Sequence, residues 1–325
     1  MSQHPEGKYE AAAAVLQAGV MRAAGGGQSV ALVRFAHRHP VVCFFVLAYA
    51  LSWASWLPLV FTGQVVTAGS GRPTQFPGLL GPVVAAFVVT AMTQGRAGLR
   101  DLVRRMGRWR VGGWWYAAVV APLVFFGVAV TVVAAGGGDW PEAAALASFS
   151  GLPQLGVLGV FALAVVVNGY GEETGWRGFA LPWLQRRHRP LVSSLLLAAG
   201  WAGWHLPLFF LLDSYRAFGL VVLPGFLIGL TCGAIVLTAV YNGTGGSILL
   251  VALWHATYNM TSATAAAKGA IAAIVSGLVI AWAVVLVVLD LTADRRGRPS
   301  PLAWREPDPV ASSDHGRTER HGPTP

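Results

Sequence analysis

Charged residues are scarce in this sequence. Only 11% of the 325 residues are charged, 55% are hydrophobic, and the mean hydropathy is +0.58. A soluble domain carries roughly 25% charged residues, so the composition excludes an ordinary soluble protein and indicates a polytopic helical membrane protein. Cysteine is nearly absent as well. Cys43 and Cys232 lie in separate apolar runs, which excludes a disulfide framework and a CxxC metal site.

The apolar residues fall into runs that approach the length of about 20 residues needed to cross a bilayer. They predict an all-α bundle of about eight transmembrane helices in one membrane-embedded domain, residues 41–291, with no second soluble domain. The expected spans are Val41–Phe61, Gly78–Thr93, Trp114–Ala135, Leu152–Tyr170, Pro190–Leu212, Ala217–Tyr241, Ser247–Thr264 and Gly269–Leu291. Residues 1–40 are predicted to form an N-terminal tail with a short surface helix at Glu10–Gln17, and residues 292–325 a disordered C-terminal tail.

The basic residues are unevenly distributed. The net charge is +9 and the pI about 10.2, yet only Arg72, Arg216 and Lys268 lie outside four segments, which are the two tails and the stretches 96–110 and 177–189. The positive-inside rule therefore places both termini in the cytoplasm of a multi-pass cell-membrane protein. Topology and attraction to anionic membrane lipid account for the charge, so no nucleic-acid partner is expected.

A few polar groups interrupt the apolar sequence. Intramembrane ionisable residues are rare and by default face the bundle interior or a water-filled cavity. These polar groups occur in three short motifs. Residues four apart share a helix face, so the motifs predict three polar helix faces that converge in the bundle. The groups are Glu172, Glu173 and Arg177 in "GEETGWRGF", Trp201 and His205 in "WAGWH", and His255 and Asn259 in "HATYN".

The first motif follows the fourth expected span. We therefore expect its carboxylates at the cytoplasmic end of that span, followed by an interfacial segment, Phe179–His188, along the membrane surface. The glycine spacing of "GYGEETG" does not indicate a phosphate loop, because the preceding strand and the GK[ST] ending are missing.

These side chains suit hydrolysis of an acyl bond by water. A buried carboxylate and a histidine can hold a water molecule and accept its proton, and a second histidine with an amide can stabilise an oxyanion. No serine or cysteine stands in an evident nucleophile setting. Alternatively, Glu172, His205 and His255 could bind zinc and leave one position open for water, although no HExxH helix is present.

Other interpretations of the polar groups remain open. Glu173 and Arg177 could be an intrahelical ion pair, His205 a core histidine, and His255 with Asn259 an interhelical hydrogen-bonding pair. A proton-coupled transporter would also carry intramembrane Glu and His, but no inverted repeat is evident.

The three motifs together resemble the CPBP family, the bacterial relatives of the type II CAAX prenyl endopeptidase that are also called Abi proteins. "EETGWRG" resembles the family's EExxxR motif, and "HATYN" its HxxxN motif. "WAGWH" resembles the second motif, in which Trp201 stands where the family most often has Phe. The ordered set covers residues 150–265.

The resemblance implies a membrane endopeptidase, with or without a metal, whose site opens toward the cytoplasm. It implies that Glu172 and His205 activate water, that His255 and Asn259 form the oxyanion site, and that Glu173 and Arg177 orient the site or the substrate. The expected substrate is a peptide or protein tail near the cytoplasmic face, prenylated or not. A non-catalytic scaffold or immunity protein with the same helices is the alternative.

Overall fold

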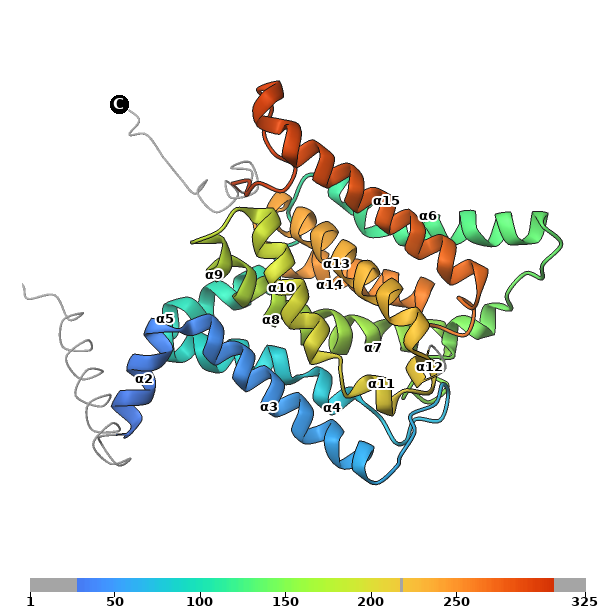
Figure 1. Cartoon of the computed structure of the whole chain (residues 1–325), viewed down its shortest axis with the longest axis horizontal. Coiled ribbons are helices and arrows are strands. Elements are labelled where there is room, and N and C mark those ends of the chain that lie inside the picture. Colours follow the sequence, from blue (N-terminus) through green and yellow to red (C-terminus); the bar gives the residue numbers. More distant parts are fainter. Residues whose placement is uncertain (1–27, 217–218, 307–325) are drawn as a thin grey trace, which may run out of the picture.

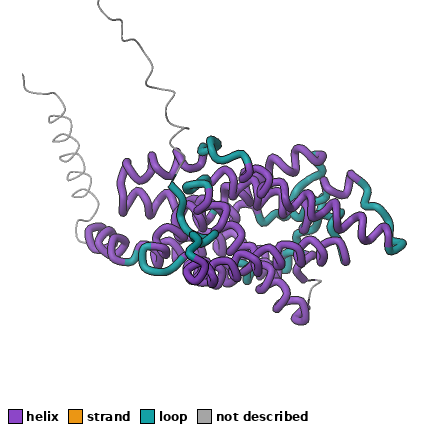
Figure 2. Tube along the Cα trace, turned by 90° about the horizontal axis from the view of Figure 1, so that it is seen from above, coloured by secondary structure: helices purple, strands orange, loops and turns teal. Residues whose placement is uncertain are grey.

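The computed structural model describes residues 28–216 and 219–306 of the chain. Within them the chain is helical, with isolated bridges between loops and no strand (Figures 1 and 2). Seven helices are long and apolar enough to cross a membrane, which confirms the multi-pass helical bundle. They are α3 (Pro40–Phe61), α4 and α5 (Phe76–Leu79 and Gly81–Met106), α6 (Trp114–Ala135), the helix Gly156–Gln185, α10 and α11 (Pro190–Trp204 and Leu208–Leu211), α13 (Gly219–Gly243) and α15 (Ala270–Ala293).

The seventh expected span, Ser247–Thr264, is a shorter, inner helix. α14 (Ile248–Ser262) has 15 residues, which is about 22 Å of helix and less than a membrane requires. It packs against α6, α13 and the helix Gly156–Gln185, and most of its side chains are buried. Ser247 caps its N-terminus, with its Oγ accepting a hydrogen bond from the backbone N–H of Leu250 at 3.2 Å. α14 is therefore surrounded by protein, and its polar side chains can be placed at the centre of the bundle.

The fourth span extends further than predicted. It is one helix from Gly156 to Gln185, built from α7 (Gly156–Leu163), a π-helical stretch η2 (Ala164–Tyr170), α8 (Gly171–Gly175), a second π-helical stretch η3 (Trp176–Ala180) and α9 (Leu181–Gln185). The expected end at Tyr170 is wrong because the charged side chains that follow are buried against other helices. The expected interfacial segment Phe179–His188 is wrong too, since Phe179, Ala180 and Leu181 belong to the core.

The second span is also longer than predicted. α5 continues past Thr93 through a kink at Gly95, whose φ of 60° is one that glycine adopts without strain, and ends at Met106. Beyond the kink Leu102 is buried, whereas Arg96 and Arg100 are exposed. The helix is amphipathic there, so the arginines mark a solvated helix face and not a loop.

The two ends of the bundle differ. α2 (Gln28–Arg38), α9 and the C-terminal end of α15 lie at one end, the left in Figure 1, which carries most of the arginines. At the other end three loops are hydrogen-bonded to one another and to the end of α11. Backbone N–H groups of Val66, Gly151 and Ala265 donate to the carbonyls of Leu211, Thr67 and Ser148 at 2.9, 3.1 and 3.0 Å. These loops form a compact cover over that end.

Both predicted tails contain ordered structure. α2 lies within the predicted N-terminal tail, whereas Glu10–Gln17 is outside the described residues. Near the other terminus the segment 299–306 folds back onto the end of α13. Leu302 is completely buried, and its carbonyl accepts a hydrogen bond from Nδ2 of Asn242 at 2.7 Å. The prediction of disorder from residue 292 is therefore wrong for the stretch up to Glu306.

Candidate active site

Glycines bring the EExxxR helix to the centre of the bundle. A Cβ on Gly175 would lie 2.6 Å from Cβ of Pro82 in α5, and one on Gly169 would lie 2.7 Å from the carbonyl oxygen of Ala252 in α14. Only residues without a side chain allow such close approach of membrane helices. The glycine spacing of the motif thus serves helix packing on two sides, and it places the charged residues between α5 and α14.

Glu173 is held by two cationic or hydrogen-bonding partners. Nη1 of Arg177, one turn along the same helix, lies 3.0 Å from its carboxylate. Nδ1 of His255, on α14, lies 2.7 Å from its Oε1. This arrangement unites the first and third motifs. Because a carboxylate only accepts hydrogen bonds, Nδ1 of His255 carries a proton and its Nε2 is left for other chemistry.

Trp201 connects the second motif to both of the others. Its Nε1–H donates to Oε2 of Glu172 at 2.8 Å. Its ring centroid lies 5.5 Å from that of His205 and 5.7 Å from that of His255, and the guanidinium carbon of Arg177 lies 4.7 Å from it. The four-residue spacing predicted that Trp201 shares a helix face with His205, but it did not predict the hydrogen bond to Glu172.

His205 lies where α10 ends. Its Nδ1 is 2.8 Å from the carbonyl oxygen of Trp201, and since a carbonyl cannot donate, that nitrogen carries a proton as well. In the neutral ring Nε2 is then the basic nitrogen. Both histidines are thus fixed through Nδ1 and keep Nε2 available, as a general base or an oxyanion donor requires.

Residual exposure separates the site into two layers. His205 is 8% exposed, His255 6% and Glu172 2%, whereas Glu173 and Arg177 are fully buried. The first three side chains can reach a water molecule or a substrate. Glu173 and Arg177 are more deeply buried, in contact with His255 and Trp201 respectively.

Comparisons with known proteins agree with this geometry. Residues 153–261, which contain all three motifs, match the Rce1-like family of type II CAAX prenyl endopeptidases. The chain is also 23% identical over 259 residues to CAAX prenyl protease 2 of Methanococcus maripaludis, a match that covers 76% of this chain and 93% of that protein. Both matches support assignment of the chain to the CAAX protease family. Together with the seven candidate membrane spans, they support an intramembrane endopeptidase activity for this multi-pass helical protein.

Two asparagines lie one helical turn from residues of this site. Asn259 lies one turn beyond His255 on α14 and is half-buried, and its side chain makes no hydrogen bond with any residue that the structure describes. Asn168 lies one turn before Glu172, and its buried Oδ1 likewise has no partner in the described chain. Sequence reasoning missed Asn168, although an Asn inside an apolar run four residues before Glu172 was a usable signal.

The side chains do not fit a zinc site as arranged. Among residues 28–216 and 219–306, no group of three or more His, Cys, Asp and Glu side chains could hold a metal ion. Glu172, His205 and His255, the candidate ligand set, are not gathered as such a group, and Oε2 of Glu172 already accepts a hydrogen bond from Trp201. The candidate site is a hydrogen-bonded group of carboxylates, imidazoles and a tryptophan.

Proposed function

We propose that the protein cleaves a peptide bond in the tail of a membrane-associated peptide or protein, using water activated by Glu172 and His205. The observation that carries the proposal is the 2.7 Å contact between Nδ1 of His255 and Oε1 of Glu173. It fixes one imidazole beside a second carboxylate, Glu172, in a site with little exposure to solvent. Such pre-organisation in a site that largely excludes water is what hydrolysis of an amide requires.

Glu172 and His205 provide the base. The indole N–H of Trp201 holds one oxygen of Glu172, which leaves the other to accept a proton from water. Nε2 of His205 accepts a hydrogen bond from the same water and orients it. The water oxygen then bonds to the carbonyl carbon of the scissile peptide while its proton passes to Glu172.

His255 and Asn259 stabilise the oxyanion that this attack creates. Nε2–H of His255 and the amide of Asn259 donate to it, and the negative charge of Glu173 favours the protonated imidazole. Arg177 offsets the charge of Glu173 and packs on Trp201. When the intermediate collapses, the C–N bond breaks, the carbonyl re-forms, and Glu172 passes its proton to the leaving amine.

The name of the Methanococcus relative indicates the substrate class to test first. That protein is a CAAX prenyl protease, so we propose a substrate whose tail follows a lipid-linked cysteine close to the membrane surface. The arginine-rich end of the bundle is the cytoplasmic one by the positive-inside rule, and the tail would approach from that side.

A peptide-cleavage assay with matched variants tests this function. Purified protein in lipid nanodiscs is given a quenched fluorescent peptide with a farnesylated cysteine four residues from its C-terminus, and the same peptide without the lipid. Glu172→Gln is expected to lower kcat by about 10²- to 10⁴-fold, because it removes the proton acceptor and keeps the shape. Glu142→Gln, at an exposed loop residue, serves as control and should cleave like the wild type.

Either peptide result bears on the proposal. Cleavage of both peptides at similar rates would retain the peptidase and remove the prenyl requirement. Unchanged turnover by Glu172→Gln would overturn the assignment of the base. A binding role replaces catalysis if the wild type cleaves neither peptide and cells that carry Glu172→Gln have the same phenotype as wild-type cells.

A further inference from the structure

A cavity outside the catalytic constellation lies at the arginine-rich end of the bundle. Its volume is about 340 Å³, and α5, α9, α13 and the docked C-terminal segment enclose it. Four guanidinium groups line it, against two carboxylates, those of Asp101 and Glu306. The arginines are Arg104, Arg105, Arg108 and Arg186. We call this cavity the arginine pocket.

The deeper arginines are held by uncharged partners as well as by Asp101. Nη1 of Arg105 donates to the carbonyl of Gly178 at 2.8 Å and to the hydroxyl of Tyr241 at 2.5 Å. Nη1 of Arg108 donates to the carbonyl of Gly245 at 2.7 Å. Carbonyl and hydroxyl groups fix the position of a guanidinium without neutralising it, so the charge of these side chains remains available to a ligand.

The positive charge of the arginine pocket exceeds its negative charge. Asp101 is shared between Arg104 and Arg105, at 2.6 and 2.8 Å. Burial, and next the charge of Arg104, lower the pKa of Arg108. Arg186 lies over the ring of Trp183 at 3.7 Å and forms an ion pair with no carboxylate in the described chain. Crowded like charges of this kind are relieved by a bound anion.

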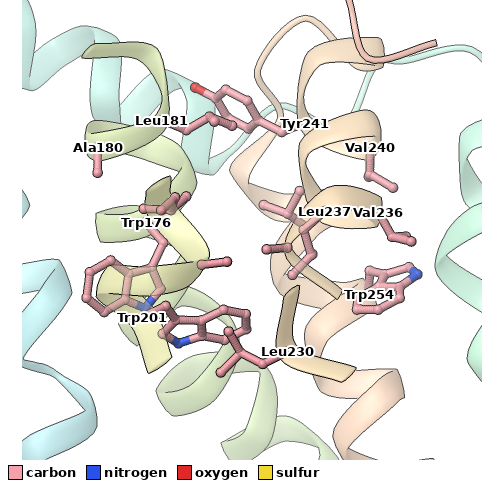
Figure 3. Close-up of a cluster of buried hydrophobic side chains, with 14 of the residues drawn as sticks. Trp176, Ala180, Leu181, Trp201, Leu230, Val236, Leu237, Val240, Tyr241 and Trp254 are labelled. Atoms are coloured by element: carbon pink, nitrogen blue, oxygen red, sulfur yellow. The ribbon is translucent and has the colours of Figure 1, made fainter. Parts of the chain in front are cut away.

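The arginine pocket is separate from the catalytic site. A Cβ on Gly178, which lines the pocket, would lie 2.7 Å from Ile248 and 3.2 Å from Leu102, both fully or almost fully buried. On α14, Ile248 precedes His255 by seven residues, which is about 10 Å of helix. Figure 3 shows the apolar side chains, among them Leu181 and Leu237, that fill the space between the motif helix and α13. A peptide tail bound at Glu172 would therefore not pass through this pocket.

The rim of the arginine pocket is apolar and aromatic. Phe179, Pro182, Trp183 and Trp304 line it together with the arginines. Tryptophan is enriched at the level of lipid head groups, and basic pockets between transmembrane helices on the cytoplasmic side bind anionic head groups. We propose that the arginine pocket binds the phosphate of an anionic phospholipid, with the acyl chains leaving past the aromatic rim.

Native mass spectrometry of detergent-purified protein tests the site with phosphatidylglycerol as the probe and phosphatidylcholine as the neutral comparison. The test variant is Arg104→Gln/Arg186→Gln, because neither side chain holds a backbone group of another helix. Its matched control is Arg100→Gln/Arg187→Gln, which removes two exposed arginines outside the pocket, one from α5 and one from the turn after α9. We expect the test pair to weaken phosphatidylglycerol binding by about tenfold or more and the control pair by less than about twofold.

A variant with the opposite effect makes the test sharper. Glu306→Gln removes a carboxylate that lines the pocket, so phosphatidylglycerol should bind about fivefold more tightly. Equal losses in the test and control pairs would mean attraction to the basic surface in general and would overturn the proposal. So would equal binding of phosphatidylcholine. Inorganic phosphate is the second probe, and if it binds as tightly as the lipid, the site is one for a free anion.

Discussion

Nδ1 of His255 lies 2.7 Å from Oε1 of Glu173, although 82 residues separate them in the sequence. The contact ties α14 to the motif helix inside the bundle. On its other side Glu173 faces the guanidinium of Arg177, and both side chains are fully buried. The three groups form a charged chain in which each member depends on the next. Their energetic dependence can be measured.

Arg177→Met should destabilise the protein by about 3 kcal/mol, because it leaves a buried carboxylate without its cationic partner. The double variant Glu173→Gln/Arg177→Met should recover more than half of that loss, since neither charge remains. Thermal unfolding in detergent measures both values. Activity should stay low in the double variant because His255 has lost its carboxylate, so recovered activity would contradict the proposed orienting role.

Trp201→Phe should lower kcat by about tenfold with little change in KM. The substitution keeps an aromatic ring next to the two histidines but removes the N–H that holds Glu172. Trp53→Phe is the matched control, since its Nε1–H donates to the carbonyl of Trp204 at 3.1 Å, outside the catalytic set. The two variants should lose similar stability. Equal kcat values would show that the Trp201 bond is only structural.

Asn259→Ala should lower activity strongly and leave stability almost unchanged. Its side chain makes no hydrogen bond with the described residues, so unfolding should change by less than about 1 kcal/mol. Loss of one oxyanion donor should lower kcat by about 10²- to 10³-fold. Steady-state cleavage and thermal unfolding, measured on the same preparation, check this. A large stability loss with unchanged kcat would place Asn259 in the fold and not in the chemistry.

Gly175→Ala should destabilise the bundle by about 1–3 kcal/mol or more, because the new methyl group would lie 2.6 Å from Pro82 and force α5 away from the motif helix. Gly229→Ala, in α13, introduces the same group where nothing lies within 4 Å. It should be neutral or slightly stabilising. Similar unfolding temperatures for the two variants would argue against close helix packing at Gly175.

Chelators should leave cleavage unchanged. Among the described residues, Glu172, His205 and His255 are not gathered as a group that could hold a metal ion. The measurement is turnover after dialysis against EDTA or 1,10-phenanthroline. Activity that disappears and returns with added zinc would reassign these residues as ligands.

The sequence predicts the bundle and the motif residues well for a simple physical reason. Apolar runs of membrane length have few alternatives to a transmembrane helix, and a charged side chain inside one of them must be buried with partners. The same reasoning misplaced two helix ends. Arg96 and Glu172 were taken as boundary signals, whereas the first lies on a solvated helix face and the second inside the bundle.

Other features depend on tertiary contacts that local patterns do not contain. The hydrogen bond from Trp201 to Glu172 joins two helices, and no spacing in the sequence indicates it. The docking of Leu302 likewise requires the end of α13, since the segment 299–306 has too few apolar residues to predict burial from composition. Long-range pairs of this kind decide which polar residues orient others.

The C-terminal return at Leu302 has a practical consequence for anyone who handles this protein. Asn242 makes two hydrogen bonds to this segment. Its side-chain amide donates to the carbonyl of Leu302, and its backbone carbonyl accepts from the N–H of Arg305 at 3.0 Å. Shortening the chain to residue 298 removes both hydrogen bonds and leaves the buried side-chain amide of Asn242 without its acceptor at Leu302. An affinity tag should therefore be added beyond Glu306, where it leaves the two hydrogen bonds of Asn242 intact.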